Sequence, residues 1–299
     1  MPAPTAGLHH VTAISGPAPE NLAFYTGRLG LSLVKKTVNF DDPGTWHLYY
    51  GDPAGSPGTI LTFFPFGDAA PGREGPGQAL AFAHCVPRGA FDGWVTRLGA
   101  GHDAIGTRFG ARVLTLRDPH GQRLELVEGD GRGDAPTGLH SATLWVEDPA
   151  PTARVLSDLL GLRAVGEEAD GPGRRLRFAA PGDGPGRFVD IVQRPGARGR
   201  QGAGTIHHIA FRAADDAHQD DIRAQVAAAG HSVTPRIDRQ YFNAVYFREP
   251  GGVLFEVATD PPGFAVDEAP DALGTALRLP PRYEPRRQEI AAGLPPLHR

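Results

Sequence analysis

The chain has 299 residues, of which 40% are hydrophobic and 21% are charged, and its formal net charge is −4. This composition is typical of a soluble globular protein with a buried core, and the acidic balance argues against a nucleic-acid-binding surface. No segment approaches the length of a membrane span, and the N-terminus lacks the pattern of a signal peptide. The single cysteine, Cys85, excludes an internal disulfide and fits a reducing environment. We therefore expect a cytoplasmic protein with no nucleic-acid or membrane partner.

Four stretches of the sequence share one order of elements: an apolar strand, a helix that ends at a Leu-Gly or Ala-Gly turn, and then further strands. The apolar spacing and the glycine after each segment predict helices around 20–29, 90–98, 150–160 and 216–229. Each repeat is therefore a βαβββ module. Self-similarity of this kind indicates one supersecondary unit that is used four times.

The four modules predict an α+β fold in which two cup-shaped mixed β-sheets carry their helices on the outside. The Gly-rich stretch 129–138 marks the linker between two domains, which we place at 1–131 (modules 1 and 2) and 132–260 (modules 3 and 4). After Asp260 the chain is Pro-rich, with a short helix expected around 285–292. We expect residues 261–299 to form a tail that packs on the body, over its second half.

Two histidine pairs, His9-His10 and His207-His208, occupy the opening strands of the first and fourth modules. Neighbouring side chains of a strand point to opposite faces, so one histidine of each pair can face a common centre. In the fourth module the bulky Ile209 shares a face with His207. If the bulky face packs against the helices, His10 and His208 face the inside of the cup.

Glu256 lies in a strand that is otherwise built of apolar residues, and an unpaired carboxylate would be very costly to bury there. Two imidazoles and one carboxylate, with the remaining positions open, are the ligand set of Fe(II) enzymes that use O₂. We therefore predict that His10, His208 and Glu256 bind a metal ion. The alternative is a structural role, with core histidines and an ion-paired glutamate.

The same alignment tests for a second metal site in the other two modules. Ala81 and Ser141 occupy the histidine positions of modules 2 and 3, whereas Glu125 matches Glu256. Only the carboxylate is retained, so we expect a single metal. The remaining histidines lie off register or in polar and turn contexts, and we assign them no catalytic role: His47, His84, His102, His120, His140, His218, His231 and His298.

Three motifs carry a resemblance to a known family: Leu8-His9-His10-Val11-Thr12, Ile206-His207-His208-Ile209 and the run 238–260. Over nearly its whole length the chain resembles the vicinal oxygen chelate (glyoxalase, bleomycin resistance and dioxygenase) superfamily. More narrowly it resembles the hydroquinone-type ring-cleaving dioxygenases, which include 2,6-dichlorohydroquinone dioxygenase. The resemblance implies a non-haem Fe(II) or Mn(II) enzyme of the extradiol type, which opens a hydroquinone-like aromatic with O₂.

The metal ligands that the resemblance implies fall on His10, His208 and Glu256, in agreement with the strand parity. The resemblance also implies roles in catalysis, or in contacts with the substrate and the metal ligands, for five residues: His207, Tyr246 and Arg239, and His9 and Thr12. Strict alternation points the first residue of each histidine pair away from the metal, so those positions require a β-bulge or a strand edge. Because the ligands come from the first and fourth modules, these two modules must share one cup.

Two other functions stay open at this stage. An isomerase or lyase of the glyoxalase type would need four protein ligands, but the fourth equivalent position lies in the apolar run 61–64. A non-catalytic resistance protein that binds an aromatic compound would need no metal, and the intact triad argues against it. The expected partners are a small aromatic substrate and O₂, and the sequence leaves the substituents of the ring and the formation of a homo-oligomer open.

Overall fold

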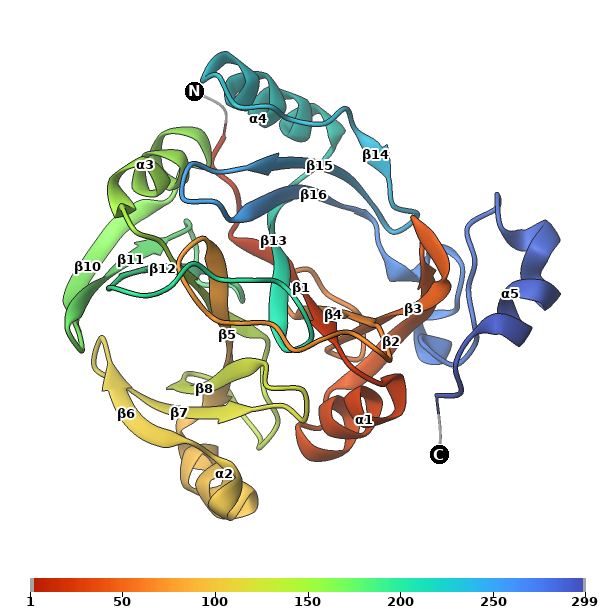
Figure 1. The fold of residues 1–299 in the computed structure, drawn as a ribbon, viewed down its shortest axis with the longest axis horizontal. Helices are drawn as coiled ribbons and strands as arrows, with labels where there is room; N and C mark the ends of the chain where they lie inside the picture. The colour runs from red at the N-terminus through yellow and green to blue at the C-terminus, as the bar shows by residue number, and fades with distance from the viewer. Residues whose placement is uncertain (1–2, 298–299) are drawn as a thin grey trace.

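A computed structural model describes residues 3–297, and most of the body consists of two curled, eight-stranded mixed β-sheets (Figure 1). The first sheet has the strand order β14-β15-β16-β13-β1-β4-β3-β2, and the second has the order β10-β11-β12-β9-β5-β8-β7-β6. The strands of the first sheet are β1 (Leu8–Ser15), β2 (Ser32–Asn39), β3 (Asp42–Gly51), β4 (Ile60–Pro65), β13 (Thr205–Ala213), β14 (Ile237–Asp238), β15 (Phe242–Arg248) and β16 (Leu254–Pro262). Those of the second sheet are β5 (Gln78–Pro87), β6 (Ala104–Arg108), β7 (Ala111–Arg117), β8 (Arg123–Gly129), β9 (Leu139–Trp145), β10 (Arg163–Asp170), β11 (Gly173–Ala179) and β12 (Phe188–Gln193).

Each sheet combines two modules: modules 1 and 4 in the first sheet, and the consecutive modules 2 and 3 in the second. The antiparallel pair β1–β13 joins module 1 to module 4, and the antiparallel pair β5–β9 joins module 2 to module 3. Within each module the first and last strands are parallel, as in β1–β4 and β13–β16. The predicted α+β fold of four modules in two sheets is confirmed, and so is the prediction that the first and fourth modules share one cup.

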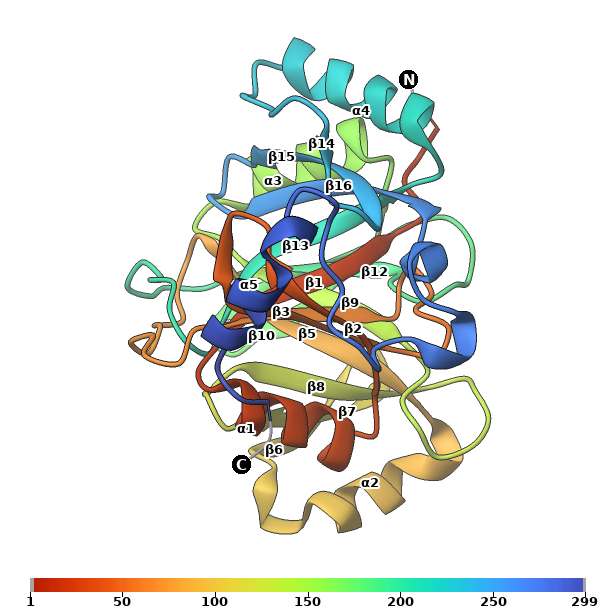
Figure 2. The ribbon, with the colours of Figure 1, turned by 90° about the vertical axis from the view of Figure 1, so that its right-hand side faces the viewer.

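The helices are short and lie outside the sheets. Figure 2 shows α4 at one end of the molecule and α2 at the other, with strands of both sheets between them. In modules 1 and 3 the predicted helix ends in a π-helical turn that closes at Gly30 or Gly161, both with a φ of +74°, a conformation that favours glycine. The helices are α1 (Ala18–Leu22, continued by the π-helix Ala23–Arg28), α2 (Phe91–Leu98), α3 (Pro149–Arg154, continued by the π-helix Val155–Leu159), α4 (Asp216–Ala228) and α5 (Arg287–Gly293).

The C-terminal tail lies mainly against module 1 and also contacts module 4, where the hydroxyl of Tyr241 donates to Asp267 at 3.1 Å. Our expectation that it covers the second half of the body therefore holds only in part. Lys35 on β2 is fully buried and binds the tail through Asp267 at 2.6 Å and Glu268 at 2.5 Å. The indole of Trp46 on β3 donates to the carbonyl of Pro295 at 2.7 Å. Figure 1 shows the tail, with α5, beside β2 and β3. His298 lies outside the described residues, and no helix within residues 3–297 is long and apolar enough to cross a membrane.

Candidate metal centre

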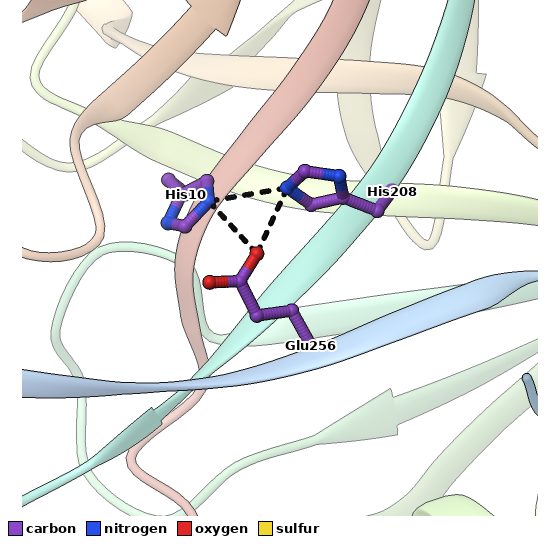
Figure 3. Close-up of side chains that lie close together, drawn as sticks. All are labelled: His10, His208 and Glu256. Carbon is purple, nitrogen blue, oxygen red and sulfur yellow. Dashed lines mark hydrogen bonds and ion pairs between the residues drawn. The ribbon is translucent and has the colours of Figure 1, made fainter. Parts of the chain in front are cut away.

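Three side chains from neighbouring strands of the first sheet point to one spot in the cup (Figure 3): His10 on β1, His208 on β13 and Glu256 on β16. The two Nε2 atoms lie 3.4 Å apart. Oε2 of Glu256 lies 2.9 Å from Nε2 of His208 and 3.4 Å from Nε2 of His10. Oε1 of Glu256 has no hydrogen-bond partner among the described residues. The structure thus brings together the three residues that the sequence selects, in a geometry that suits a divalent cation.

The electrostatics of Glu256 and His208 favour the protonation states that bind a metal. Burial raises the pKa of Glu256, but the adjacent His10 and His208 outweigh burial and hold that pKa well below its usual range. Burial lowers the pKa of His208, although Glu256 opposes the shift. Glu256 is therefore an ionised carboxylate and His208 a neutral imidazole at neutral pH, and metal binding requires these forms.

Two β-bulges place the first residue of each histidine pair beside the second. The β1–β13 pairing runs from Leu8 directly to His10 and so skips His9, and on β13 it skips His207 in the same way. Nδ1 of His9 lies 2.9 Å from Nδ1 of His10, and Nδ1 of His207 lies 2.8 Å from Nδ1 of His208. The bulges that the resemblance required are present, and they turn both side chains toward the ligand imidazoles.

The neighbouring histidines are built to accept hydrogen bonds from the ligands. Burial lowers the pKa of His9 well below its usual value and lowers that of His207 to about 3, in each case helped by the adjacent ligand histidine. Both are therefore neutral and can accept the Nδ1–H of His10 and His208, respectively. That hydrogen bond leaves each ligand Nε2 unprotonated and free to coordinate a metal.

Tyr246 and Arg239 form a second pair beside the triad. Tyr246 on β15 lies opposite Glu256 in the strand register, and Nε of Arg239 donates to its phenolic oxygen at 3.2 Å. Nη1 of Arg239 also donates to Asp41 at 3.1 Å. Burial raises the pKa of Tyr246 well above its usual value and Glu256 adds to the effect, so the opposing influence of Arg239 does not bring that pKa down. Arg239 therefore lowers the pKa of Tyr246 in part, and burial keeps that pKa above its usual value.

A cavity of about 440 Å³ lies next to the triad. Much of its wall is apolar and includes Phe40, Phe64, Phe66 and Phe242. The ring of Phe242 packs against His10 at a centroid distance of 5.0 Å. A planar aromatic ring therefore fits the shape and polarity of the space in front of the candidate metal site.

The polar residues of this cavity that the sequence reasoning missed include His47 and Tyr49 on β3. Their side chains share one face of the strand, and Tyr49 lies opposite Thr62 on β4. The sequence showed that residues 47 and 49 share one face of a strand. Whether that face meets the cavity depends on a strand register that the sequence does not fix. Thr12, which the resemblance selected, also lines the cavity.

The second cup lacks the two ligand histidines of the first. Ala81 and Ser141 stand where the ligand histidines would be, and Glu125 forms an ion pair with Arg108. Arg177 binds Asp190 through two hydrogen bonds of 2.8 and 2.9 Å. Guanidinium groups thus neutralise the carboxylates of this cup.

The chain is similar to known proteins over nearly its whole length. A Bacillus subtilis (strain 168) protein named "Putative ring-cleaving dioxygenase MhqO" is 47% identical over 308 residues, which cover 98% of this chain and 96% of the relative. The chlorohydroquinone/hydroquinone 1,2-dioxygenase of Sphingobium indicum is 31% identical over 314 residues, which cover 97% of this chain and 96% of the relative.

Solved structures show the same relationship. The crystal structure of a "putative dioxygenase" from Bacillus subtilis strain 168 has a TM-score of 0.93 at 46% identity and covers 99% of this chain and 98% of that one. Glyoxalase I from Zea mays shares the fold, with a TM-score of 0.66 at 13% identity over 85% of this chain and 92% of that one. The family model described as the glyoxalase/bleomycin resistance protein/dioxygenase superfamily matches residues 7–126 and 138–257. The chain belongs to the glyoxalase/bleomycin resistance protein/dioxygenase superfamily.

Proposed function

We propose that this protein is a metal-dependent ring-cleaving dioxygenase, which opens a hydroquinone-like aromatic with O₂. The observation that carries the proposal is the cluster of His10, His208 and Glu256 at the wall of an aromatic cavity. Three protein ligands leave coordination positions for a substrate oxygen and for O₂. The names of the relatives support this activity, since they specify ring cleavage and, in one case, hydroquinones.

The metal that we propose is Fe(II) or Mn(II), with His10, His208 and Glu256 as its ligands. The unpartnered Oε1 of Glu256 and the neutral imidazole of His208 support a divalent cation at this position. When bound, a redox-active divalent metal would bind the phenolic oxygen and O₂ and would allow electron density to pass from the ring to O₂. His9 and His207 hold the ligand imidazoles in orientation through the two Nδ1 contacts.

The cavity side chains would bind the substrate and move its protons. The aromatic walls hold the ring and exclude water. Tyr246 stays protonated because its pKa is raised, so its hydroxyl can donate to a substrate oxygen while Arg239 holds the phenolic oxygen in place. His207 is the second candidate for proton transfer, and Thr12 contacts the substrate. The bond that we propose to break lies next to a hydroxyl-bearing ring carbon, which is cleavage of the extradiol type.

Chemistry of the glyoxalase type is disfavoured by the residue at the fourth ligand position. In module 4 Ala210 pairs with Glu256, and the equivalent pair in module 1 is Thr12 with Thr62. A threonine is a poor substitute for the carboxylate that a fourth ligand would require.

We further propose that residues 1–131 and 132–260 are the two domains and that residues 261–299 are a tail. The single cysteine of the chain, Cys85, supports a cytoplasmic location.

The test is an anaerobic reconstitution with Fe(II) or Mn(II), followed by a panel of hydroquinones and catechols and then by air. The proposal predicts O₂ uptake and a ring-opened acid in the presence of at least one hydroquinone. The metal-free protein is the control and is expected to show neither. Failure of every compound in the panel to cause O₂ uptake would reject the dioxygenase activity.

A further inference from the structure

A chain of hydrogen bonds runs behind the cavity wall on the module 1 side of the candidate metal site. Oγ1 of Thr12 and Oγ1 of Thr62 lie 2.7 Å apart, and Oγ1 of Thr62 lies 2.8 Å from Nε2 of His47. Nδ1 of His47 lies 3.0 Å from the hydroxyl of Tyr49. Thr12 and Thr62 are fully buried, so water does not replace these bonds.

The position of Thr62 in module 1 corresponds to the position of a candidate metal ligand in module 4. The parallel register pairs Thr12 with Thr62 in module 1, where module 4 pairs Ala210 with Glu256. Thr62 is therefore the counterpart of the carboxylate ligand. Its shorter side chain does not line the cavity, whereas Thr12 and His47 do. On the module 1 side the cavity wall thus carries Thr12, which Thr62 supports from behind, and no further protein ligand.

We infer that Thr62 and His47 are positioning residues, which hold the hydroxyl of Thr12 so that it binds an oxygen of the ring substrate. This inference rests on the proposed function, because it concerns the substrate of the same site. Thr12 lies opposite His208 in the β1–β13 register, and it lines the same cavity as the three candidate ligands. A phenol whose oxygen approaches the metal from this side is the chemical class that the arrangement recognises.

The tautomer of His47 decides in which direction the chain donates its hydrogen bonds. Burial lowers the pKa of His47 well below its usual value, and the nearby His10 and His208 contribute to the effect. A neutral imidazole has one donor and one acceptor nitrogen. If Nε2 donates to Thr62, the hydroxyl of Thr12 is free to donate to the substrate, and if Nε2 accepts, Thr12 can accept from the substrate. The ring of His47 is fixed against Phe64 and Tyr49, with centroid distances of 4.3 and 4.2 Å.

The decisive variant is Thr62→Val, which keeps the shape of the side chain and removes its hydroxyl. We expect the Mn(II) content to stay at the wild-type level. The affinity for hydroquinone, measured anaerobically by calorimetry on the Mn(II)-loaded protein, should fall about tenfold, because one hydrogen bond contributes about that factor. Thr62→Ser retains the hydroxyl and should restore the affinity. His47→Phe keeps the packing against Phe64 and should repeat the loss.

The matched control is Thr143→Val, since Thr143 occupies in the second cup the position that Thr12 occupies in the first. It should bind metal and hydroquinone as the wild type does. Wild-type affinity in Thr62→Val, or an equal loss in Thr62→Ser, would overturn the inference while leaving the proposed function in place. A wild-type protein that neither binds hydroquinone nor consumes O₂ with it would overturn both.

Discussion

The Nε2 atoms of His10 and His208 lie 3.4 Å apart, although 198 positions separate the two histidines in the chain. Their approach depends on the antiparallel pairing of β1 with β13, which lie at the centre of the first sheet. Both strands are almost entirely buried. The core of the sheet, and not a loop, therefore sets the distance between the two candidate ligands, which is the arrangement that holds a site most rigidly.

The first prediction concerns the carboxylate of the triad. Glu256→Gln should lower the affinity for Fe(II) or Mn(II) by more than about 100-fold, because the loss of a charged ligand exceeds the loss of a residue that only orients one. The metal content of the purified, reconstituted protein measures the effect. Glu125→Gln, at the equivalent position of the second cup, is the matched control and should retain wild-type metal. Equal metal content in the two variants would contradict the assignment of the ligand.

A second prediction concerns the ion pair in the second cup. Arg108→Ala leaves the carboxylate of Glu125, which is only 3% exposed, without its cation. We expect a loss of about 3 kcal/mol in the free energy of unfolding, measured with urea, because an uncompensated buried charge is strongly destabilising. The double variant Arg108→Met with Glu125→Leu should recover most of that loss. A double variant less stable than Arg108→Ala would show that the ion pair itself stabilises the fold.

The third prediction concerns pH and His84 on β5. Burial lowers the pKa of His84 from 6.5 to about 4, and neither ring nitrogen has a hydrogen-bond partner among the described residues. Between these pH values the unfolded chain takes up a proton that the folded chain does not. Above pH 6.5 His84 therefore does not reduce the free energy of unfolding. Below that pH the free energy of unfolding falls as the pH is lowered toward 4. We expect His84 to account for about 2 kcal/mol of the stability lost between pH 7 and pH 5.

His84→Phe tests this account, because it keeps a ring beside Phe82 and removes the titrating group. Urea unfolding at pH 7 and at pH 5 should show a smaller loss of stability in the variant than in the wild type. His140, with a pKa that burial lowers to about 4, keeps its own share of the pH dependence in both proteins. An unchanged difference between the two pH values would contradict the role of His84.

The fourth prediction concerns the attachment of the tail. Lys35→Met leaves Glu268, which is buried, without its ammonium partner, and we expect a loss of about 3 kcal/mol in the free energy of unfolding. The tail should also become accessible to limited proteolysis beyond residue 260. Lys36→Met is the control, since the half-buried Lys36 donates through its ammonium group to the carbonyl of Thr275 at 2.8 Å and forms no ion pair with a tail carboxylate among the described residues. Equal protease resistance in both variants would show that Lys35 does not hold the tail.

The candidate site could be predicted from the sequence to the extent that it depends on local periodicity. Strand parity selected His10 over His9 and His208 over His207, and the repeat of the pairs in equivalent strands identified the shared cup. The resemblance implied an irregularity at His9 and His207, but the sequence pattern did not show where the bulges lie. A bulge is a property of two paired strands.

Other features depend on contacts that local sequence does not specify. His47 meets Thr62 only because β3 and β4 pair in one particular register. Lys35 lies 232 positions before Asp267, and charge alone did not identify them as partners. The tail was therefore assigned to the second half of the body alone, although its short helix was predicted within about two residues.

The measurement that tests the dioxygenase proposal most directly is the fate of both atoms of O₂. The Fe(II)-loaded protein is mixed anaerobically with a hydroquinone that it consumes, ¹⁸O₂ is admitted, and the products are analysed by mass spectrometry. We predict a ring-opened acid that carries two ¹⁸O atoms, and no such product from Glu256→Gln. Conversion of the hydroquinone without ¹⁸O in the product, or with equal yield from Glu256→Gln, would contradict a dioxygenase that uses this triad.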